Sequence, residues 1–210
     1  MKDKRTKILR NKVAQEAALL LYTSQEKEYK QAKKRASLNL GARVFPSNFE
    51  VAEELDRLSK EREGAKREEL LLRMRIEAKE IMEHLKVFNP SLVGSVWRGT
   101  VHQNSDIDIQ TFSQDNQEII EKLQKNKYKI NGSEWRAITK QGRKESSFHI
   151  NIILPSNDNV EISVRSLDRL GELEICEIYG DNKTGLNLNQ LERILKENPL
   201  QKFLPNRKIC

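Results

Sequence analysis

The chain has 210 residues with a net charge of +7; a third of them are charged and 37% are hydrophobic. No apolar run approaches the roughly 20 residues that span a bilayer, and the basic start lacks the apolar stretch of a secretory signal. We therefore expect a soluble cytoplasmic protein with no membrane partner, in which Cys176 and Cys210 are reduced thiols.

The excess positive charge lies at the N-terminus. Residues 1–40 hold eleven Lys or Arg and four Asp or Glu, a balance of +7 that equals the net charge of the whole chain. A localised basic face is typical of proteins that bind nucleic acid, because it neutralises phosphates. It is equally typical of a solvated lysine-rich helix, and charge alone does not separate the two interpretations.

The first half of the chain predicts helices. Apolar residues recur at helical spacing in two segments within residues 6–40, separated by a polar break at 23–24. A third helix is expected after the break and N-cap candidate at 46–48, and a long helix follows from Gly64 to about residue 87.

From residue 91 the pattern changes to short β-branched runs divided by turn residues, which indicate strands. The runs lie at 92–93, 107–112, 128–130, 148–154 and 160–164. Helices are expected at about 115–126 and at 188–197, the second capped by Asn187 with Gln190 three residues on.

Helices first, followed by mixed strands and helices, predict an α+β fold. We divide the chain into a basic helical N-terminal region at 1–86, a small mixed-sheet core at 87–170, and a C-terminal segment with one helix at 171–210.

Two aspartates lie close together on one predicted strand. Alternate residues of a strand face the same side, so Asp106 and Asp108 project together while Ile107 and Ile109 face the core. Carboxylates about 7 Å apart on one strand face repel each other. A divalent cation removes this repulsion, and hard carboxylate oxygens suit magnesium (or manganese), whose coordination is usually completed by substrate phosphates.

A Gly-Ser pair precedes these aspartates. The strand at 92–93 ends at Gly94, and a short helix is expected to begin at Ser95. Glycine lets the backbone approach a ligand closely, and free N–H groups at a helix start, with the Ser95 hydroxyl, suit a phosphate. Alone, Gly-Ser is a common turn and Asp-Ile-Asp is often a polar strand edge. Together they meet the requirements of phosphoryl or nucleotidyl transfer.

This arrangement resembles the DNA polymerase beta-like nucleotidyltransferase superfamily, whose mark is Gly-Ser after a strand and Asp-x-Asp or Asp-x-Glu on the next. With Arg98-Gly99-Thr100 between the two motifs, the core looks like the minimal nucleotidyltransferases and the archaeal CCA-adding enzymes. The segments 25–41 and 46–58 are similar to a group of largely archaeal predicted nucleotidyltransferases. The resemblance implies magnesium-dependent transfer of a nucleoside monophosphate from a triphosphate such as ATP.

The resemblance also implies a third carboxylate on a later strand. Residues 148–154 and 160–164 predict a β-hairpin, and Glu161 lies on the polar side of its second strand. We expect Glu161 to complete the catalytic and metal-binding set with Asp106 and Asp108. The family more often has Asp here, so a solvated strand residue is the other interpretation, and Asp158 in the turn is a substitute.

The same resemblance implies the nucleotide-binding residues. Gly94 and Ser95 would bind the β- and γ-phosphates, and Arg98 or Arg165 would supply positive charge to the departing pyrophosphate. Both arginines are equally interpretable as ion-pair residues.

The acceptor of the transferred nucleotide stays open. RNA or tRNA bound by the basic N-terminal helices is one interpretation, and a small molecule is another. A partner protein, as in the transferases of toxin–antitoxin pairs, is a third. The alternative to catalysis is a nucleic-acid-binding protein with a relict transferase fold.

Overall fold

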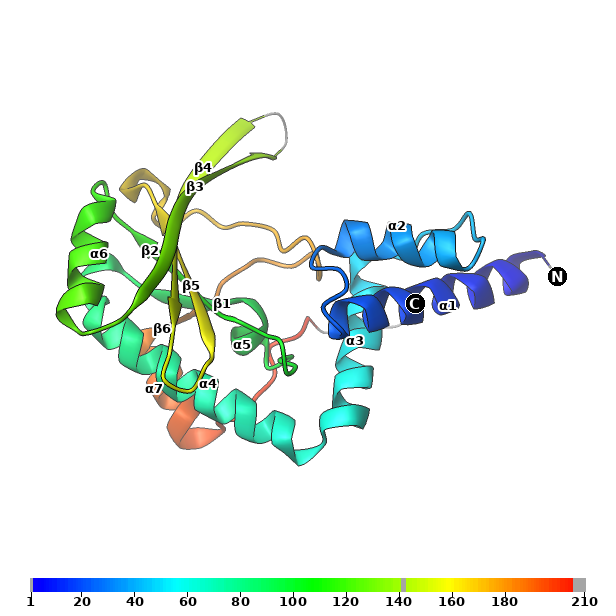
Figure 1. Cartoon of the computed structure of the whole chain (residues 1–210), viewed down its shortest axis with the longest axis horizontal. Helices are drawn as coiled ribbons and strands as arrows, with labels where there is room; N and C mark the ends of the chain where they lie inside the picture. Colours follow the sequence, from blue (N-terminus) through cyan, green and yellow to red (C-terminus); the bar gives the residue numbers. More distant parts are fainter. Residues whose placement is uncertain (1, 141–142, 206–210) are drawn as a thin grey trace.

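The computed structural model describes residues 2–140 and 143–205; Cys210 lies outside these, and Cys176 is a free thiol. A helical part and a sheet part lie side by side along the long axis of the molecule (Figure 1). The described residues form seven α-helices and one six-stranded sheet, so the expected α+β class is confirmed. Within these ranges, every helix is too short or too polar to span a bilayer.

The helical part consists of three helices, α1 (Lys2–Tyr22), α2 (Tyr29–Asn39) and α3 (Asn48–Glu63). The Ser47 side chain accepts from the backbone N–H of Glu50, whose own side chain accepts from the N–H of Ser47. This capping box sets the start of α3 where the sequence predicts it. The three helices share a small apolar cluster built on buried residues, among them Val13, Ala17, Leu21, Ala32, Ala36 and Val51.

The strands form one mixed sheet in the order β3-β4-β5-β2-β1-β6. Their bounds are β1 (Ser91–Val93), β2 (Ile107–Phe112), β3 (Ile130–Lys140), β4 (Arg143–Ile153), β5 (Asn159–Arg165) and β6 (Leu186–Asn187). The central strands β2 and β5 run parallel, and every other neighbouring pair is antiparallel. Side chains alternate between the faces, so one face of the central strands is apolar and the other polar.

Helices cover only the apolar face of this sheet. Side chains of α4 (Ala65–His84), α6 (Asn116–Lys125) and α7 (Leu188–Glu197) form one cluster with the buried residues of the strands. Two short 3-10 helices, Lys86–Phe88 and Leu167–Arg169, complete the elements. Since α4 packs on the sheet, its apolar surface belongs to the sheet core; the boundary at residue 86 stays a prediction.

The segment between β5 and β6 leaves the sheet and returns to it. It reaches the helical part, where the ring of Tyr179 lies edge-on to Phe49 with 6.0 Å between ring centroids (Figure 1). Residues of this segment therefore lie close both to the helices and to the sheet, although they come late in the chain.

The strand predicted at 128–130 is wrong in its extent. β3 pairs with β4 along its length in an antiparallel hairpin that rises beyond the rest of the sheet (Figure 1). Residues 131–137 are all exposed, so apolar alternation could not reveal this strand. β3 is an edge strand, and its backbone pairing with β4 does not depend on side-chain burial.

Candidate active site

Two central strands place three carboxylates on the polar face of the sheet. Asp106 directly precedes β2, Asp108 lies within it, and Glu161 lies in β5. Asp108 and Glu161 are partners in the parallel register of these strands, so their side chains leave the same face side by side. The structure thus brings the three predicted carboxylates to one region.

Gly94 lies against the carboxylate of Asp108. Val93 pairs with Asp108 across β1 and β2, and Gly94 then opens the short helix α5 (Gly94–Arg98) with a φ of +69°. A Cβ atom on Gly94 would lie 2.0 Å from Oδ2 of Asp108, which no side chain could satisfy without displacing the carboxylate. The Gly-Ser turn and the aspartate pair are therefore adjacent in space, as the motif predicts.

A buried arginine of α4, Arg75, holds α5 in position through hydrogen bonds. The guanidinium of Arg75 donates to the carbonyl oxygens of Val96 (3.1 Å) and Trp97 (3.0 Å). It also donates to those of Pro199 (2.6 Å) and Gln201 (2.8 Å) in the segment after α7. Burial lowers the pKa of Arg75 to about 10. The position of the Gly-Ser turn thus depends on a side chain that touches no substrate.

The environment of the carboxylates disfavours their charged forms. Burial, with the nearby charges of Glu161 and Asp106, raises the pKa of Asp108 to about 7, while Lys183 opposes the rise. Loss of solvent and the charge of Glu161 also raise the pKa of Asp106, against a hydrogen bond with Asn159. Such mutual repulsion is what a bound cation would relieve.

Glu161 contacts two side chains from strands β3 and β4. Oε1 of Glu161 accepts from the guanidinium of Arg136 on β3 and lies 2.8 Å from Nδ1 of His149 on β4. In the tautomer that donates from Nδ1, Nε2 of His149 accepts from the hydroxyl of Ser147 at 2.8 Å. The third carboxylate therefore faces the aspartates while it is bound to cationic and imidazole groups.

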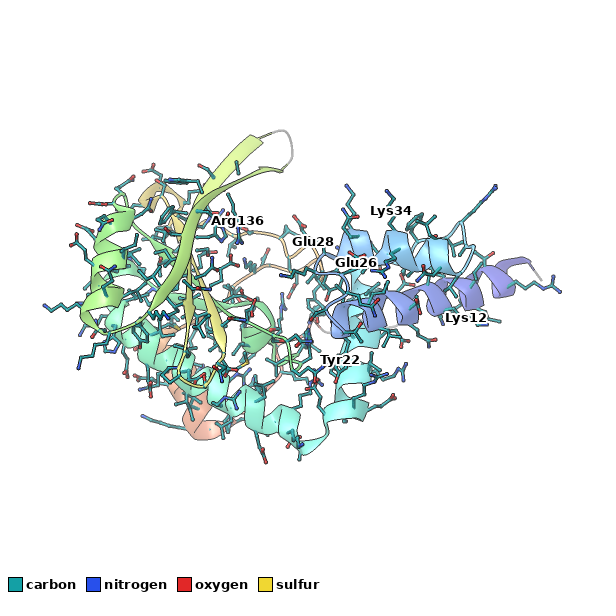
Figure 2. The ribbon with its side chains drawn as sticks, viewed as in Figure 1. Lys12, Tyr22, Glu26, Glu28, Lys34 and Arg136 are labelled. Carbon is teal, nitrogen blue, oxygen red and sulfur yellow. The ribbon has the colours of Figure 1, made fainter. Side chains whose placement is uncertain are left out.

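A polar cleft of about 500 Å³ opens between this face and the turn that joins α1 to α2. Figure 2 shows Glu28, at the start of α2, on the side of the helical part that faces Arg136. The cleft is lined by Lys27, Glu28, Asp106, Asn131, Arg136, Asn151, Ile152, Ile153, Asn159, Val160 and Glu161. The turn between the two N-terminal helices thus contributes directly to the walls of the site.

The donor set fits a hard divalent cation at Asp106 and Asp108. Their oxygens are the ligands that magnesium prefers. Because Gly94 has no side chain, the carboxylate of Asp108 can lie directly against its backbone. Among the described residues, no three His, Cys, Asp or Glu side chains already sit where they could share one ion. For Glu161 to join the aspartates on an ion, its carboxylate would have to be shared between that ion and the two groups that contact Oε1, Arg136 and His149.

The family comparison matches the part of the chain that holds this geometry. A family model described as a nucleotidyltransferase domain matches residues 75–156. Residues 75–156 are thus similar to nucleotidyltransferase domains. The match confirms the predicted resemblance and includes Gly94, Ser95, Asp106 and Asp108. It ends before Glu161, whose assignment therefore stays a prediction.

Two solved structures are similar to parts of this chain. One, described as the structure of a GLD-2/RNP-8 complex, is 14% identical over 55% of this chain and 40% of its own, with a TM-score of 0.33. The other, a cytoplasmic RNA terminal U-transferase, is 20% identical over 59% of this chain and 34% of its own, with a TM-score of 0.27. No curated protein matches the chain significantly.

Arg98 lies within the matched segment but outside the lining of the cleft, so the structure favours the ion-pair interpretation of this residue over contact with pyrophosphate. It is only 4% exposed and forms a two-point ion pair with Asp181 at 2.6 and 2.7 Å. Its guanidinium also lies over the rings of Trp97 and Tyr179. Arg98 points away from the cleft because it lies at the end of α5 opposite the Gly-Ser turn. Its ion pair with Asp181 connects α5 to the segment before β6.

Ser95 and Arg165, which are also predicted to bind the nucleotide, lie at opposite ends of the region. Ser95 is half-buried in the first turn of α5, beside Gly94. Arg165 lies on the same face of β5 as Glu161 but four residues further on, about 13 Å along the strand. There it pairs with Glu174. Both assignments stay predictions.

Sequence reasoning missed four residues around the carboxylates. Lys27 and Lys183 lie close enough to lower the pKa of Asp106 and of Asp108, respectively. Arg136 and His149 contact Glu161. Period-two alternation places His149 on the face of Glu161. Arg136 and the two lysines come from segments that are distant in sequence, and sequence alone does not show that these segments lie beside the carboxylates.

Proposed function

We propose that the chain is an active nucleotidyltransferase that uses magnesium (or manganese) to move a nucleoside monophosphate from a nucleoside triphosphate to an acceptor hydroxyl. The contact between Gly94 and the carboxylate of Asp108, beside Asp106, carries this proposal. It joins the two halves of the motif in space within the matched domain.

Asp106 and Asp108 would hold the metal ion, which supplies charge neutralisation of the triphosphate and orientation of its α-phosphorus. Glu161 faces the same space and would accept the proton of the attacking hydroxyl or share the ion. The acceptor oxygen then bonds to the α-phosphorus as the bond to pyrophosphate breaks.

Positive side chains at the rim would bind the phosphates. Lys27 approaches Asp106 from the turn before α2, and Lys183 approaches Asp108 from the segment before β6. Each brings positive charge near an aspartate, and such groups would stabilise a triphosphate bound there and a departing pyrophosphate. They replace Arg98 in the role that the motif had suggested for it.

The test is incubation with each labelled nucleoside triphosphate, magnesium, and RNA, protein and small-molecule acceptors. We expect incorporation into one acceptor class, and its loss in Asp106→Asn and Asp108→Asn. Glu118→Gln on the exposed side of α6 changes the same charge away from the cleft and should keep the activity. No incorporation into any acceptor, or activity that survives both aspartate variants, would rule the proposal out.

The ion pair at Glu161 also supports a second candidate, a non-catalytic nucleic-acid-binding protein with a relict site. In such a protein, the contacts of Glu161 with Arg136 and His149 would compensate the charge of this carboxylate without a metal ion. Tight nucleic-acid binding that is indifferent to magnesium and to Asp108→Asn, with no transfer, would favour this candidate.

A further inference from the structure

A row of lysines leads away from the cleft along the outer side of α2. Lys27 lines the cleft, and Lys30 and Lys34 follow on the solvent side of α2, opposite the buried Ala32 and Ala36. Helical rise puts about 6 Å between Lys30 and Lys34, and Lys27 lies in the turn before the helix. Figure 2 shows Lys34 on the side of α2 that faces away from α1.

The charges of this row are not neutralised by ion pairs. Within the described ranges, none of the three lysines lies in ion-pair distance of a carboxylate. Glu26 forms an ion pair with Arg35, whereas Glu28 lines the cleft. Lys30 and Lys34 are four residues apart on one helix, where like charges repel. A bound polyanion would relieve that repulsion.

We infer that Lys27, Lys30 and Lys34 bind the phosphate backbone of a single-stranded nucleic acid whose end enters the cleft at Asp106. Two conditions meet there: unneutralised positive charge that suits a row of phosphates, and a start inside the polar cleft. A strand end must lie close to the aspartates for its hydroxyl to be the acceptor. This inference rests on the proposed function for the reaction, although the binding itself needs no catalysis.

The experiment measures binding of fluorescent single-stranded RNA and DNA oligonucleotides to the full chain over a range of salt, without nucleotide. The test variant is Lys30→Gln with Lys34→Gln, which leaves the cleft itself intact. The matched control is Lys7→Gln with Lys12→Gln on α1, which removes the same charge from exposed positions; Lys12 lies on the other side of the hairpin from Lys34 (Figure 2).

We expect the test variant to bind roughly tenfold more weakly and its salt dependence to decrease by about 1 to 2 in slope. The control should bind as the wild type does. Stronger binding of RNA than of DNA assigns RNA as the partner, and equal binding assigns the shared backbone. Equal weakening in both variants, no weakening in the test variant, or comparable binding of polyglutamate would overturn the inference.

Transfer assays separate this inference from the proposed reaction. In the test variant, the KM for an oligonucleotide acceptor should increase while the KM for the nucleoside triphosphate stays unchanged. If no acceptor is modified but the binding results hold, the proposed reaction fails and the inferred surface stands. If transfer to a small molecule or a protein proceeds and both lysine variants behave alike, the surface fails and the reaction stands.

Discussion

Asp108 and Glu161 are register partners on the parallel strands β2 and β5, and their carboxylates face the same side of the sheet. With Asp106 before the strand, three negative groups occupy one region that is partly shielded from solvent. Burial and the two neighbouring charges together raise the pKa of Asp108 to about 7. The protein thus holds an arrangement that is unfavourable in the absence of a cation, and this has measurable consequences.

The first prediction concerns stability against pH. The pKa of Asp108 is about 7 in the folded state, above the ordinary value of 3.8, so the folded state keeps a proton that the unfolded chain has lost. The free energy of unfolding should therefore decrease as the pH rises from about 4 to about 7. Asp108→Asn should lack this decrease, and Asp168→Asn on an exposed 3-10 helix should keep it. Urea unfolding at several pH values measures the difference.

The second prediction uses two glycines with the same backbone constraint. Gly94→Ala places a Cβ atom on the carboxylate of Asp108, whereas a Cβ atom added to Gly41, at φ +57°, would have nothing within 4 Å. Both substitutions should cost about 1 kcal/mol for the left-handed conformation. Only Gly94→Ala should also reduce kcat, by about a hundredfold, because Asp108 must move. Equal kinetics in the two variants would contradict the assigned contact.

The chemistry that sequence could predict is the part that depends on short-range geometry. Asp106 and Asp108 share a face because a strand alternates, and Glu161 follows by the same rule on β5. The adjacency of Gly94 follows from the short path between the motifs. The positions of these residues can be predicted without knowing how distant segments pack.

The remainder of the site comes from long-range packing. Lys27 reaches Asp106 because the α1–α2 hairpin docks beside the sheet, and Arg136 reaches Glu161 because the exposed strand β3 adds to the edge. Neither segment shows apolar alternation that would reveal its neighbours. Arg98 is the opposite case. It is close to the motif in sequence, but the turn of α5 directs its side chain to Asp181.

The third prediction tests whether Arg136 competes with metal for Glu161. Arg136→Gln removes the ion pair and leaves the carboxylate free to join Asp106 and Asp108. Because the pair is partly exposed, we expect manganese to bind the nucleotide-free protein only about two- to fivefold more tightly. Arg57→Gln, which breaks surface pairs on α3, is the control. Calorimetric titration measures both, and unchanged or weaker binding in Arg136→Gln would remove Glu161 from the metal site.

The fourth prediction concerns Arg75, which donates to four carbonyl oxygens and has no carboxylate partner among its hydrogen bonds. Arg75→Met keeps much of the side-chain volume but leaves those buried carbonyls without this donor, so it should lower the free energy of unfolding by about 3 kcal/mol or more. Arg73→Met, on the exposed side of the same helix, removes an ion pair with Asp158 in which the arginine is half-exposed, and should cost less than Arg75→Met. Because α5 carries the Gly-Ser turn, the folded Arg75→Met protein should also have a lower kcat. A destabilised variant with full kcat would show that Arg75 supports the fold without positioning the turn.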